Sequence, residues 1–265
     1  MTDLGRDPLP LRGRVALVTG ASRRAGIGYA VCRRLAAYGA SVFVHHFSPH
    51  DATQPWGADE VTSVVDGVRS ALADPAARVA DMSADLADPA MPAHLVSSAV
   101  AELGGLDILV CNQALSGSDG PLSTMTAARL DAHWTVNARA SILLARAFAD
   151  LGRPGRLIFL TSGQNEGPMP DEVAYAASKG ALWSITATLA DGLADQGVTV
   201  NAVNPGPVDT GYAPPDARAA VAARFPGGDW GTPDDPARLI AWLATDEARW
   251  ITGQVINTEG GFRRW

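Results

Sequence analysis

The sequence contains little cysteine, no excess of positive charge and no long apolar run. Its two cysteines, Cys32 and Cys111, are far apart and lack metal-ligand spacing, which argues against a disulfide framework or a zinc site. We expect buried free thiols in a reducing compartment, the cytoplasm. The net charge of -7 argues against a general nucleic-acid-binding protein, which needs a basic face. No run reaches the roughly 18 apolar residues that indicate a membrane span.

The sequence does contain enough apolar residues for one large core. Of its 265 residues, 47% are hydrophobic and 18% are charged, which is typical of a globular domain rather than a disordered chain. Residues 1–11 lack the apolar segment of a secretory signal and are predicted to be a short polar tail. Residues 12–265 are predicted to form a single domain.

Apolar, β-branched runs alternate along this domain with longer helical patterns, which predicts βαβ units and a parallel sheet covered on both faces. The predicted fold class is therefore α/β, a doubly wound, Rossmann-type sheet in a three-layer α/β/α arrangement. Its ligand crevice lies at the carboxyl ends of the strands. The predicted strands are 14–19, 41–46, 77–82, 107–112, 155–162, 198–203 and 253–258, and the predicted helices are 27–39, 58–72, 92–103, 126–150, 172–194 and 234–245.

A glycine-rich segment, TGASRRAGIG (19–28), lies between the first predicted strand and the first helix. Its first glycine gap is longer than that of the common dinucleotide motif. In this context the segment predicts a tight turn that brings backbone N–H groups and a helix N-terminus to a pyrophosphate; the alternative is an ordinary strand–helix turn with incidental glycines. The residues predicted to contact the cofactor are Gly20, Ser22, Arg23, Arg24, Gly26, Ile27 and Gly28.

The two arginines of this segment favour NADP(H) over NAD(H). The second strand ends at His45-His46-Phe47-Ser48 and supplies no carboxylate for a ribose until Asp51. An arginine suits a 2′-phosphate, whereas a solvated arginine pair beside a helix N-terminus is disfavoured by the helix dipole. A metal site at His45, His46 and His50 lacks a ligand pattern, so no metal is predicted.

A second constellation predicts acid–base chemistry. Tyr175 and Lys179 are four residues apart on a predicted helix and share one of its faces. A lysine ammonium in a partly desolvated cleft lowers the pKa of a neighbouring tyrosine. Ser162 ends the preceding strand, where its hydroxyl can bind a substrate oxygen; the alternative is an ordinary serine in a turn.

With these residues in place, the sequence resembles the short-chain dehydrogenase/reductase family in its single-domain form, over residues 12–262. Within the family the resemblance is to proteins labelled 3-oxoacyl-carrier-protein reductase. The matching segments occur in family order and are 19–28, ADLAD (84–88), DILVCNQA (107–114), VNARAS (136–141), Ser162, YAASK (175–179), NAVNPGPVDT (201–210) and ITGQVINTEGGF (251–262).

The resemblance implies a role for each matching residue. Tyr175 is the acid in ketone reduction and the base in alcohol oxidation, Lys179 lowers its pKa and binds the nicotinamide ribose, and Ser162 holds the substrate oxygen. Asn137 anchors a water that links Lys179 to solvent. The remaining cofactor contacts are Asp85 and Leu86 at the adenine, Asn112 and Ala114 beside the fourth strand, and Pro205, Gly206, Val208 and Thr210 at the nicotinamide and phosphate end.

Two departures from the family pattern stand out. Ala114 replaces a glycine in the segment that the family writes Asn-Asn-Ala-Gly, and the first glycine gap has the length found in bacterial enoyl-acyl-carrier reductases. That branch spaces its tyrosine and lysine more widely and lacks the serine. Ser162 and the four-residue step from Tyr175 to Lys179 therefore group the sequence with carbonyl reductases.

The predicted function is hydride transfer between NADP(H) and a ketone or secondary alcohol, with a 3-oxoacyl thioester among the possible substrates. A substrate lid is expected at about 206–232, with Tyr212, Phe225 and Trp230 as apolar walls. The family implies a homotetramer or homodimer through helices 126–150 and 172–194. A non-catalytic nucleotide-binding regulator on the same fold is the alternative, and an epimerase or dehydratase would need a longer chain.

Overall fold

The computed structural model describes residue 5 and residues 7–264. Seven strands of the described chain form one parallel sheet in the order β3-β2-β1-β4-β5-β6-β7. Their bounds are β1 Val15–Val18, β2 Ser41–His46, β3 Val79–Ser83, β4 Ile108–Cys111, β5 Gly155–Leu160, β6 Val198–Asn204 and β7 Val255–Asn257. The predicted Rossmann-type, doubly wound sheet is confirmed, because the chain starts in the middle of the sheet and winds outward to each edge in turn.

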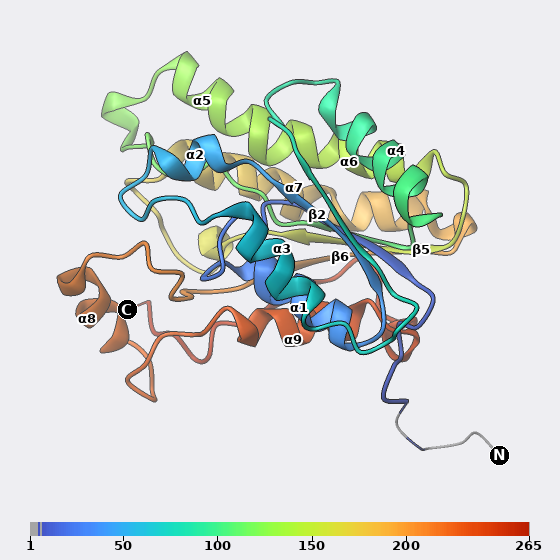
Figure 1. Ribbon diagram of the computed structural model, residues 1–265. Helices are drawn as coiled ribbons and strands as arrows, with labels where there is room; N and C mark the ends of the chain where they lie inside the picture. The colour runs from blue at the N-terminus through green and yellow to red at the C-terminus, as the bar shows by residue number, and fades with distance from the viewer. Residues whose placement is uncertain (1–4, 6, 265) are drawn as a thin grey trace.

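Helices cover both faces of this sheet (Figure 1). One layer contains α1 (Ile27–Ala37), α3 (Val61–Arg69) and α9 (Asp234–Leu243), and the other contains α4 (Met91–Leu103), α6 (Ala140–Ala149) and α7 (Val173–Gly192). The shorter elements are α2 Ser48–Ala52, η1 Leu122–Thr124, α5 Ala127–His133, η2 Trp134–Arg139, η3 Gly163–Asn165, η4 Ala194–Gln196, α8 Pro215–Ala222 and η5 Asp246–Ala248.

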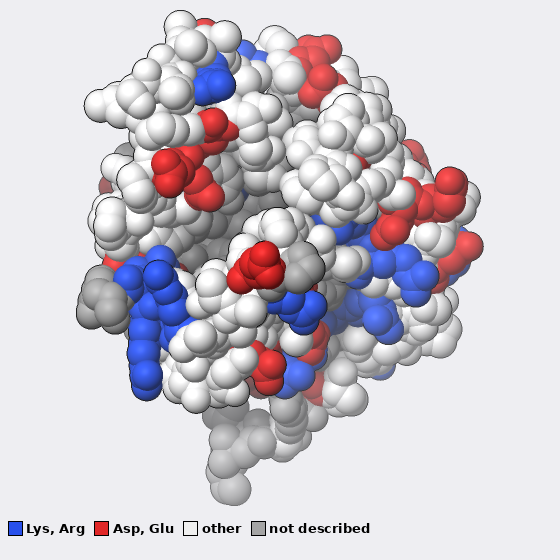
Figure 2. Space-filling model, turned by 90° about the vertical axis from the view of Figure 1, so that its left-hand side faces the viewer, with Lys and Arg blue, Asp and Glu red and all other residues white. Residues whose placement is uncertain are grey.

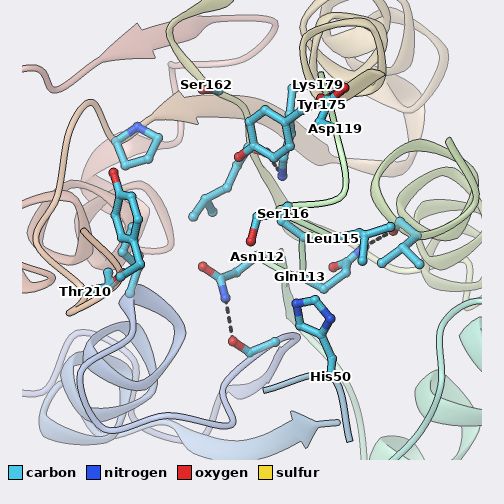
Figure 3. Close-up of a pocket in the computed structure, with 18 of the residues that line it drawn as sticks. His50, Asn112, Gln113, Leu115, Ser116, Asp119, Ser162, Tyr175, Lys179 and Thr210 are labelled. Atoms are coloured by element: carbon cyan, nitrogen blue, oxygen red, sulfur yellow. Dashed lines mark hydrogen bonds between the residues drawn. The ribbon is translucent and has the colours of Figure 1, made fainter. Parts of the chain in front are cut away.

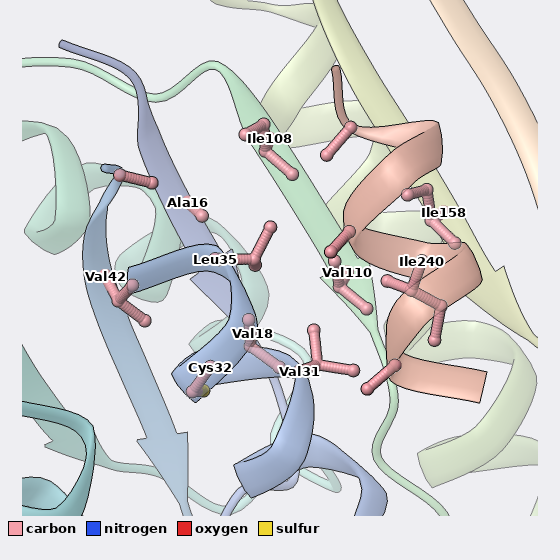
Figure 4. Packing of buried hydrophobic residues seen from close by; sticks show 14 of the residues in the cluster. Ala16, Val18, Val31, Cys32, Leu35, Val42, Ile108, Val110, Ile158 and Ile240 are labelled. Carbon is pink, nitrogen blue, oxygen red and sulfur yellow. The ribbon is translucent and has the colours of Figure 1, made fainter. Parts of the chain in front are cut away.

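Strand β1 shows why the sequence requires two helical layers. All four of its residues are buried, and alternate residues face opposite sides of the sheet. Ala16 and Val18 join the core beneath α1 and α9, where Leu35 is fully buried (Figure 4). Val15 and Leu17 join the other core, beneath α4 and α6. An uninterrupted apolar strand therefore needs cover on both faces.

The structure differs from the prediction at two places. The helix predicted over 126–150 is three elements, because the π-helical turn η2 (Trp134–Arg139) separates α5 from α6. Residues 1–4 and 6 of the predicted tail lie outside the described residues; Leu11, near its end, is buried, and its N–H donates to the carbonyl of Tyr38 at 2.9 Å. None of the helices in the described part of the chain is long and apolar enough to cross a membrane.

Candidate active site

The turn after β1 and the first turn of α1 each contain a glycine, Gly20 and Gly28, that lies too close to its neighbours to carry a side chain. Gly20 has a φ of +67°, and a Cβ there would lie 2.7 Å from Cα of Gln113. A Cβ on Gly28 would lie 2.6 Å from Nδ2 of Asn112. That amide donates to the carbonyls of Thr19 and Gly20, both at 2.9 Å. Asn112, just after β4, therefore holds the glycine turn in place.

The N-terminus of α1 has free backbone donors at the cleft. Gly26 is the N-cap in an extended conformation; the described residues provide no side-chain cap, and the first turn has no acidic residue. Ile27, the first residue of the helix, lines the cleft. Free N–H groups at the positive end of a helix dipole bind phosphates. Together with the side-chain-free surface at Gly20, this cradle fits the pyrophosphate of a dinucleotide.

The structure separates the two arginines of the loop. Arg23 lines the cleft, its guanidinium donates to the carbonyl of Thr210 at 2.9 Å, and its Cζ lies 5.4 Å from the ring centroid of Trp56. Arg24 is exposed and outside the cleft lining, and its backbone N–H donates to Asp59 at 2.6 Å. Of the two predicted phosphate contacts, only Arg23 has its side chain at the cleft.

The histidines at the end of β2 have structural partners. Nδ1 of His45 accepts from the N–H of Gly20 at 3.1 Å, and its Nε2 donates to the carbonyl of Ala84 at 2.9 Å. Burial lowers the pKa of His45 to about 4, so the ring is neutral. His46 pairs with Asp81, whereas His50 lines the cleft. Within the described residues, no three His, Cys, Asp or Glu side chains are grouped to hold a metal.

Ser162, Tyr175 and Lys179 meet on one wall of the cleft (Figure 3). Ser162 follows β5, and the other two residues lie one turn apart at the start of α7. Lys179, the single lysine among twenty arginines in the sequence, is only 2% exposed. Its Nζ donates to the carbonyl of Leu160 at 2.9 Å and lies 5.8 Å from the ring centroid of Tyr175. Burial lowers the pKa of Lys179 to about 8.

The pKa of Tyr175 is raised, which differs from the lowering expected from Lys179. Burial is the main cause, and the negative charge of Glu172 adds to it. A hydrogen bond with Ser162 acts in the opposite direction. The Nζ of Lys179 donates to the strand carbonyl of Leu160 rather than to the phenol. In the protein alone, Tyr175 is therefore a protonated phenol at neutral pH.

Asn137 lies in the π-helical turn between α5 and α6 and is fully buried. Its Oδ1 accepts from the N–H of Leu115 at 2.6 Å, and its Nδ2 donates to the carbonyl of Leu115 at 3.1 Å and to Ser178 Oγ at 3.0 Å. Turns of this type are rare and concentrate at functional sites. Asn137 thus connects the segment after β4 with α7, immediately beside Lys179, although its side chain does not line the cleft.

Asp119 has a role at the site that sequence reasoning missed. Its carboxylate accepts from the backbone N–H groups of Tyr175 at 2.7 Å and Ala174 at 3.1 Å, so it caps α7 from a distant segment. Burial alone would raise the pKa of Asp119, but these donors and the N–H of Gly120 hold it below its usual range. The ring of His133 packs edge-on against Tyr175, with a centroid distance of 6.3 Å. The tyrosine is therefore held at both its backbone and its ring.

Comparisons with known proteins agree with this arrangement. A family model described as Enoyl-(Acyl carrier protein) reductase matches residues 20–263. The chain is 42% identical over 257 residues to the uncharacterised oxidoreductase YjdA of Bacillus subtilis, covering 95% of this chain and 97% of that protein. A short-chain dehydrogenase of Burkholderia cenocepacia, solved in complex with NADP, is 36% identical with a TM-score of 0.83, covering 95% and 98% of the two chains.

A blue fluorescent protein from a metagenomic library, solved in complex with NADPH, is 34% identical with a TM-score of 0.83 and covers 96% of this chain and 99% of its own. The chain belongs to the short-chain dehydrogenase/reductase family. This protein is therefore an oxidoreductase of the dehydrogenase/reductase class, which acts on CH–OH and C=O groups.

The cleft of this short-chain dehydrogenase/reductase has a volume of about 1200 Å³. It opens on the face where the strands end, and Figure 2 shows a hollow there with acidic and basic side chains at its rim. Four predicted site residues do not line it: Arg24, Gly26, Gly28 and Asn137. Those that do are Gly20, Ser22, Arg23, Ile27, Asp85, Leu86, Asn112, Ala114, Ser162, Tyr175, Lys179, Pro205, Gly206, Val208 and Thr210.

The segment after β4, in which Ala114 departs from the family pattern, is held in place by the residue before it. Ala114 lines the cleft, and the preceding Gln113 is buried. The amide of Gln113 accepts from Thr19 at 2.5 Å and donates to Ser141 at 2.8 Å. It therefore joins the start of the glycine turn to α6, next to the π-helical turn.

The predicted lid contains α8, and Val208 pairs with Gly231 at its two ends. Tyr212 and Trp230 line the cleft and pack edge-on, with ring centroids 5.9 Å apart. The prediction for Phe225 was wrong: its ring lies outside the cleft lining and packs on Phe262 at 5.1 Å. Phe225 turns away because the segment after β7 supplies an apolar partner there.

Proposed function

We propose that this short-chain dehydrogenase/reductase uses NADPH to reduce a ketone to a secondary alcohol. The observation that carries the proposal is the placement of Ser162, Tyr175 and Lys179 on one wall of a cleft that also contains the N-terminus of α1. A regulator that only binds a nucleotide needs the cradle but not this wall. The cofactor would supply the hydride.

The chain's own residues hold the carbonyl and deliver the proton. The hydroxyls of Ser162 and Tyr175 both donate to the substrate oxygen, which polarises the carbonyl and fixes its position. Tyr175 then transfers its proton to that oxygen as negative charge develops on it. Because the pKa of Tyr175 is raised, the phenol is in the form that reduction requires. To Lys179, beside the tyrosine ring, and Asn137, which donates to the neighbouring Ser178, we assign the relay that returns the proton from solvent.

Arg23 supports a preference for NADP(H) over NAD(H). Its guanidinium uses one N–H for Thr210 and lies over Trp56, which leaves further donors for a 2′-phosphate. Arg24 is exposed and serves as a matched control. We expect Arg23→Ala to lower kcat/KM for NADPH by about tenfold or more while leaving NADH nearly unchanged, because a charged hydrogen bond contributes about 1.5–3 kcal/mol. Equal losses for both cofactors would mean that Arg23 acts through the lid instead.

An acyl-carrier partner receives less support from the surface. Arg129, Arg139 and Arg146, which could contribute to a basic entrance, all have intramolecular partners: Thr124, the carbonyl of Ala87 and Asp150, respectively. Small carbonyl compounds are therefore our preferred substrate class.

We propose a homo-oligomer that buries α5, η2 and α7. Trp134 and Trp183 on these elements are 48% and 46% exposed, and Leu130 is also exposed. Sedimentation of Trp134→Glu/Trp183→Glu against the unchanged protein tests this, since the charges would release monomers.

The deciding assay follows loss of NADPH absorbance with an acetoacetyl thioester, a β-keto ester, an aromatic ketone and a cyclic ketone. A crotonyl thioester is included because the matching family model is described as an enoyl reductase. Reduction of a ketone, abolished by Tyr175→Phe, supports the proposal. Reduction of the crotonyl thioester alone would contradict it.

A further inference from the structure

We propose that Arg264 is a positioning residue for Ser162, a role that rests on the proposed ketone reduction. The C-terminal segment 258–264 runs beside the loop that follows Ser162. This loop begins with the 3-10 turn η3 (Gly163–Asn165), whose N-cap is Ser162 itself. Anything that fixes this turn therefore also fixes the backbone of the serine.

The side chain of Arg264 occupies space that two glycines of the loop leave open. A Cβ on Gly163 would lie 2.9 Å from Cζ of Arg264 and closer still to its Nη2. A Cβ on Gly167 would lie 2.6 Å from Cδ of the same side chain. The side chain of Arg264 thus packs against both ends of the loop 163–167. At the two contact positions the loop has glycines and therefore no side chains.

An ion pair anchors the guanidinium to the sheet. Arg264 pairs with Glu259, and the two side chains are only 14% and 12% exposed. Glu259 also accepts from Nδ2 of Asn204, the last residue of β6, at 2.7 Å. Oδ1 of Asn204 in turn accepts from the N–H of Gly206 at 3.0 Å. A charged pair that is nearly buried and tied to a strand end is a rigid support, because separating it would leave a charge without a partner.

The pair also forms part of the cleft wall. Glu259, Arg264, Gly163 and Ser162 all line the main cleft, and a second cavity of about 370 Å³ lies on the other side of the pair. The same segment holds the lid, since the N–H of Arg263 donates to the carbonyl of Arg224, two residues after the end of α8. The ion pair between Arg264 and Glu259 therefore separates the main cleft from the second cavity beside Ser162. Without it, the loop 163–167 has open space on both sides.

The first test measures the loop directly and does not depend on activity. We expect Arg264→Ala to increase amide hydrogen exchange in residues 163–167 under conditions where the variant stays folded, while NADPH affinity changes little. Arg263→Ala is the matched control, because its side chain has no ion pair or hydrogen bond among the described residues. Unchanged exchange in Arg264→Ala would overturn the proposal, whether or not the protein reduces ketones.

The second test asks whether Arg264 acts through Ser162. We expect Arg264→Ala to lower kcat by about tenfold to a hundredfold, because a misplacement of about 1 Å has effects of that size. In a Ser162→Ala background the same change should have little further effect. If the double variant instead loses kcat by the product of the two single-variant factors, Arg264 acts independently of Ser162 and the proposal is contradicted.

Gly163→Ala gives a third measurement that keeps the arginine. Its methyl group would displace the guanidinium, so we expect a loss of kcat in the otherwise unchanged protein and no further loss when Arg264 is already alanine. If Arg264→Ala does not fold, Gly163→Ala and Arg264→Gln, which preserves most of the volume, carry the comparison. An unchanged kcat in both would refute the role of Arg264. Absence of any ketone reduction by the wild-type protein would instead refute the proposed function.

Discussion

Replacing Lys179 with methionine should stabilise the cofactor-free protein while abolishing its activity. Lys179 is buried, and its pKa is lowered from 10.5 to about 8. A lowered lysine pKa means that the ammonium form destabilises the folded state at every pH below about 8. At 1.36 kcal/mol per pKa unit, the difference corresponds to about 3 kcal/mol.

The hydrogen bond from Nζ to the carbonyl of Leu160 opposes this gain. Its loss removes about 1 kcal/mol, so the expected net stabilisation by Lys179→Met is about 2 kcal/mol near neutral pH. As pH rises from about 8 to 10.5, the unfolded chain binds more protons than the folded one, and the wild-type protein becomes more stable. The difference in free energy of unfolding between Lys179→Met and the wild-type protein should therefore fall to zero between about pH 8 and pH 10.5. At the upper end of that interval the wild-type protein should be slightly more stable.

Urea unfolding at fixed protein concentration, at neutral pH and at about pH 10.5, measures the difference. Lys179→Arg is the control, because arginine keeps its charge throughout and should show no pH-dependent recovery. The pKa itself can be read from one NMR signal in protein labelled with ¹⁵N-lysine, since the sequence has a single lysine. A methionine variant that is less stable by the same amount at both pH values would refute the reasoning.

Three further changes test other parts of the site. Tyr175→Phe should remove most turnover but leave NADPH binding intact, because only the proton donor is lost; steady-state kinetics and a fluorescence titration check both. Gly28→Ala should weaken NADPH binding by about tenfold or more, because its Cβ would lie 2.6 Å from Asn112, and unchanged affinity in the same titration would contradict the phosphate cradle. Asp119→Asn should lower the free energy of unfolding by about 1–2 kcal/mol. The pKa of Asp119 is lowered in the folded state, so this difference should be full at neutral pH and shrink as pH falls through the acid range; a difference that is constant with pH would refute it.

The parts of the fold that the sequence predicted are those encoded by local pattern. Continuous apolar runs such as those of β1 and β4 predict buried strands. Their alternation with helical patterns along the chain is enough to predict a doubly wound sheet. The π-helical turn was not predictable, because residues 134–139 continue the helical pattern on both sides. Its backbone departs from an α-helix where Gln113 donates to the carbonyl of Val136 at 3.3 Å, a contact between distant segments.

The same division applies to the site. Ser162, Tyr175, Lys179 and the glycine turn belong to short motifs, and the structure brings all of them to one cleft. Asp119 is 55 residues before Ala174, and no spacing rule connects a loop aspartate with a helix that begins so much later. The separation of Arg23 from Arg24 likewise depends on Thr210 and Trp56, which only the folded chain places beside the loop. Contacts of this kind are set by topology rather than by pattern.

The single lysine also makes the cleft chemically addressable. Every other cationic side chain of the Lys/Arg class is an arginine, so a small amine-directed acylating reagent has one side-chain amine to find, and that amine is only 2% exposed. The rate at which Lys179 is labelled should therefore depend on how often the cleft opens and not on the reactivity of exposed surface groups. If added NADPH protects Lys179 from the reagent, the protected fraction measures the fraction of protein molecules whose cofactor site is able to bind NADPH. A preparation could then be graded by the fraction of its molecules that bind cofactor, before any substrate is known.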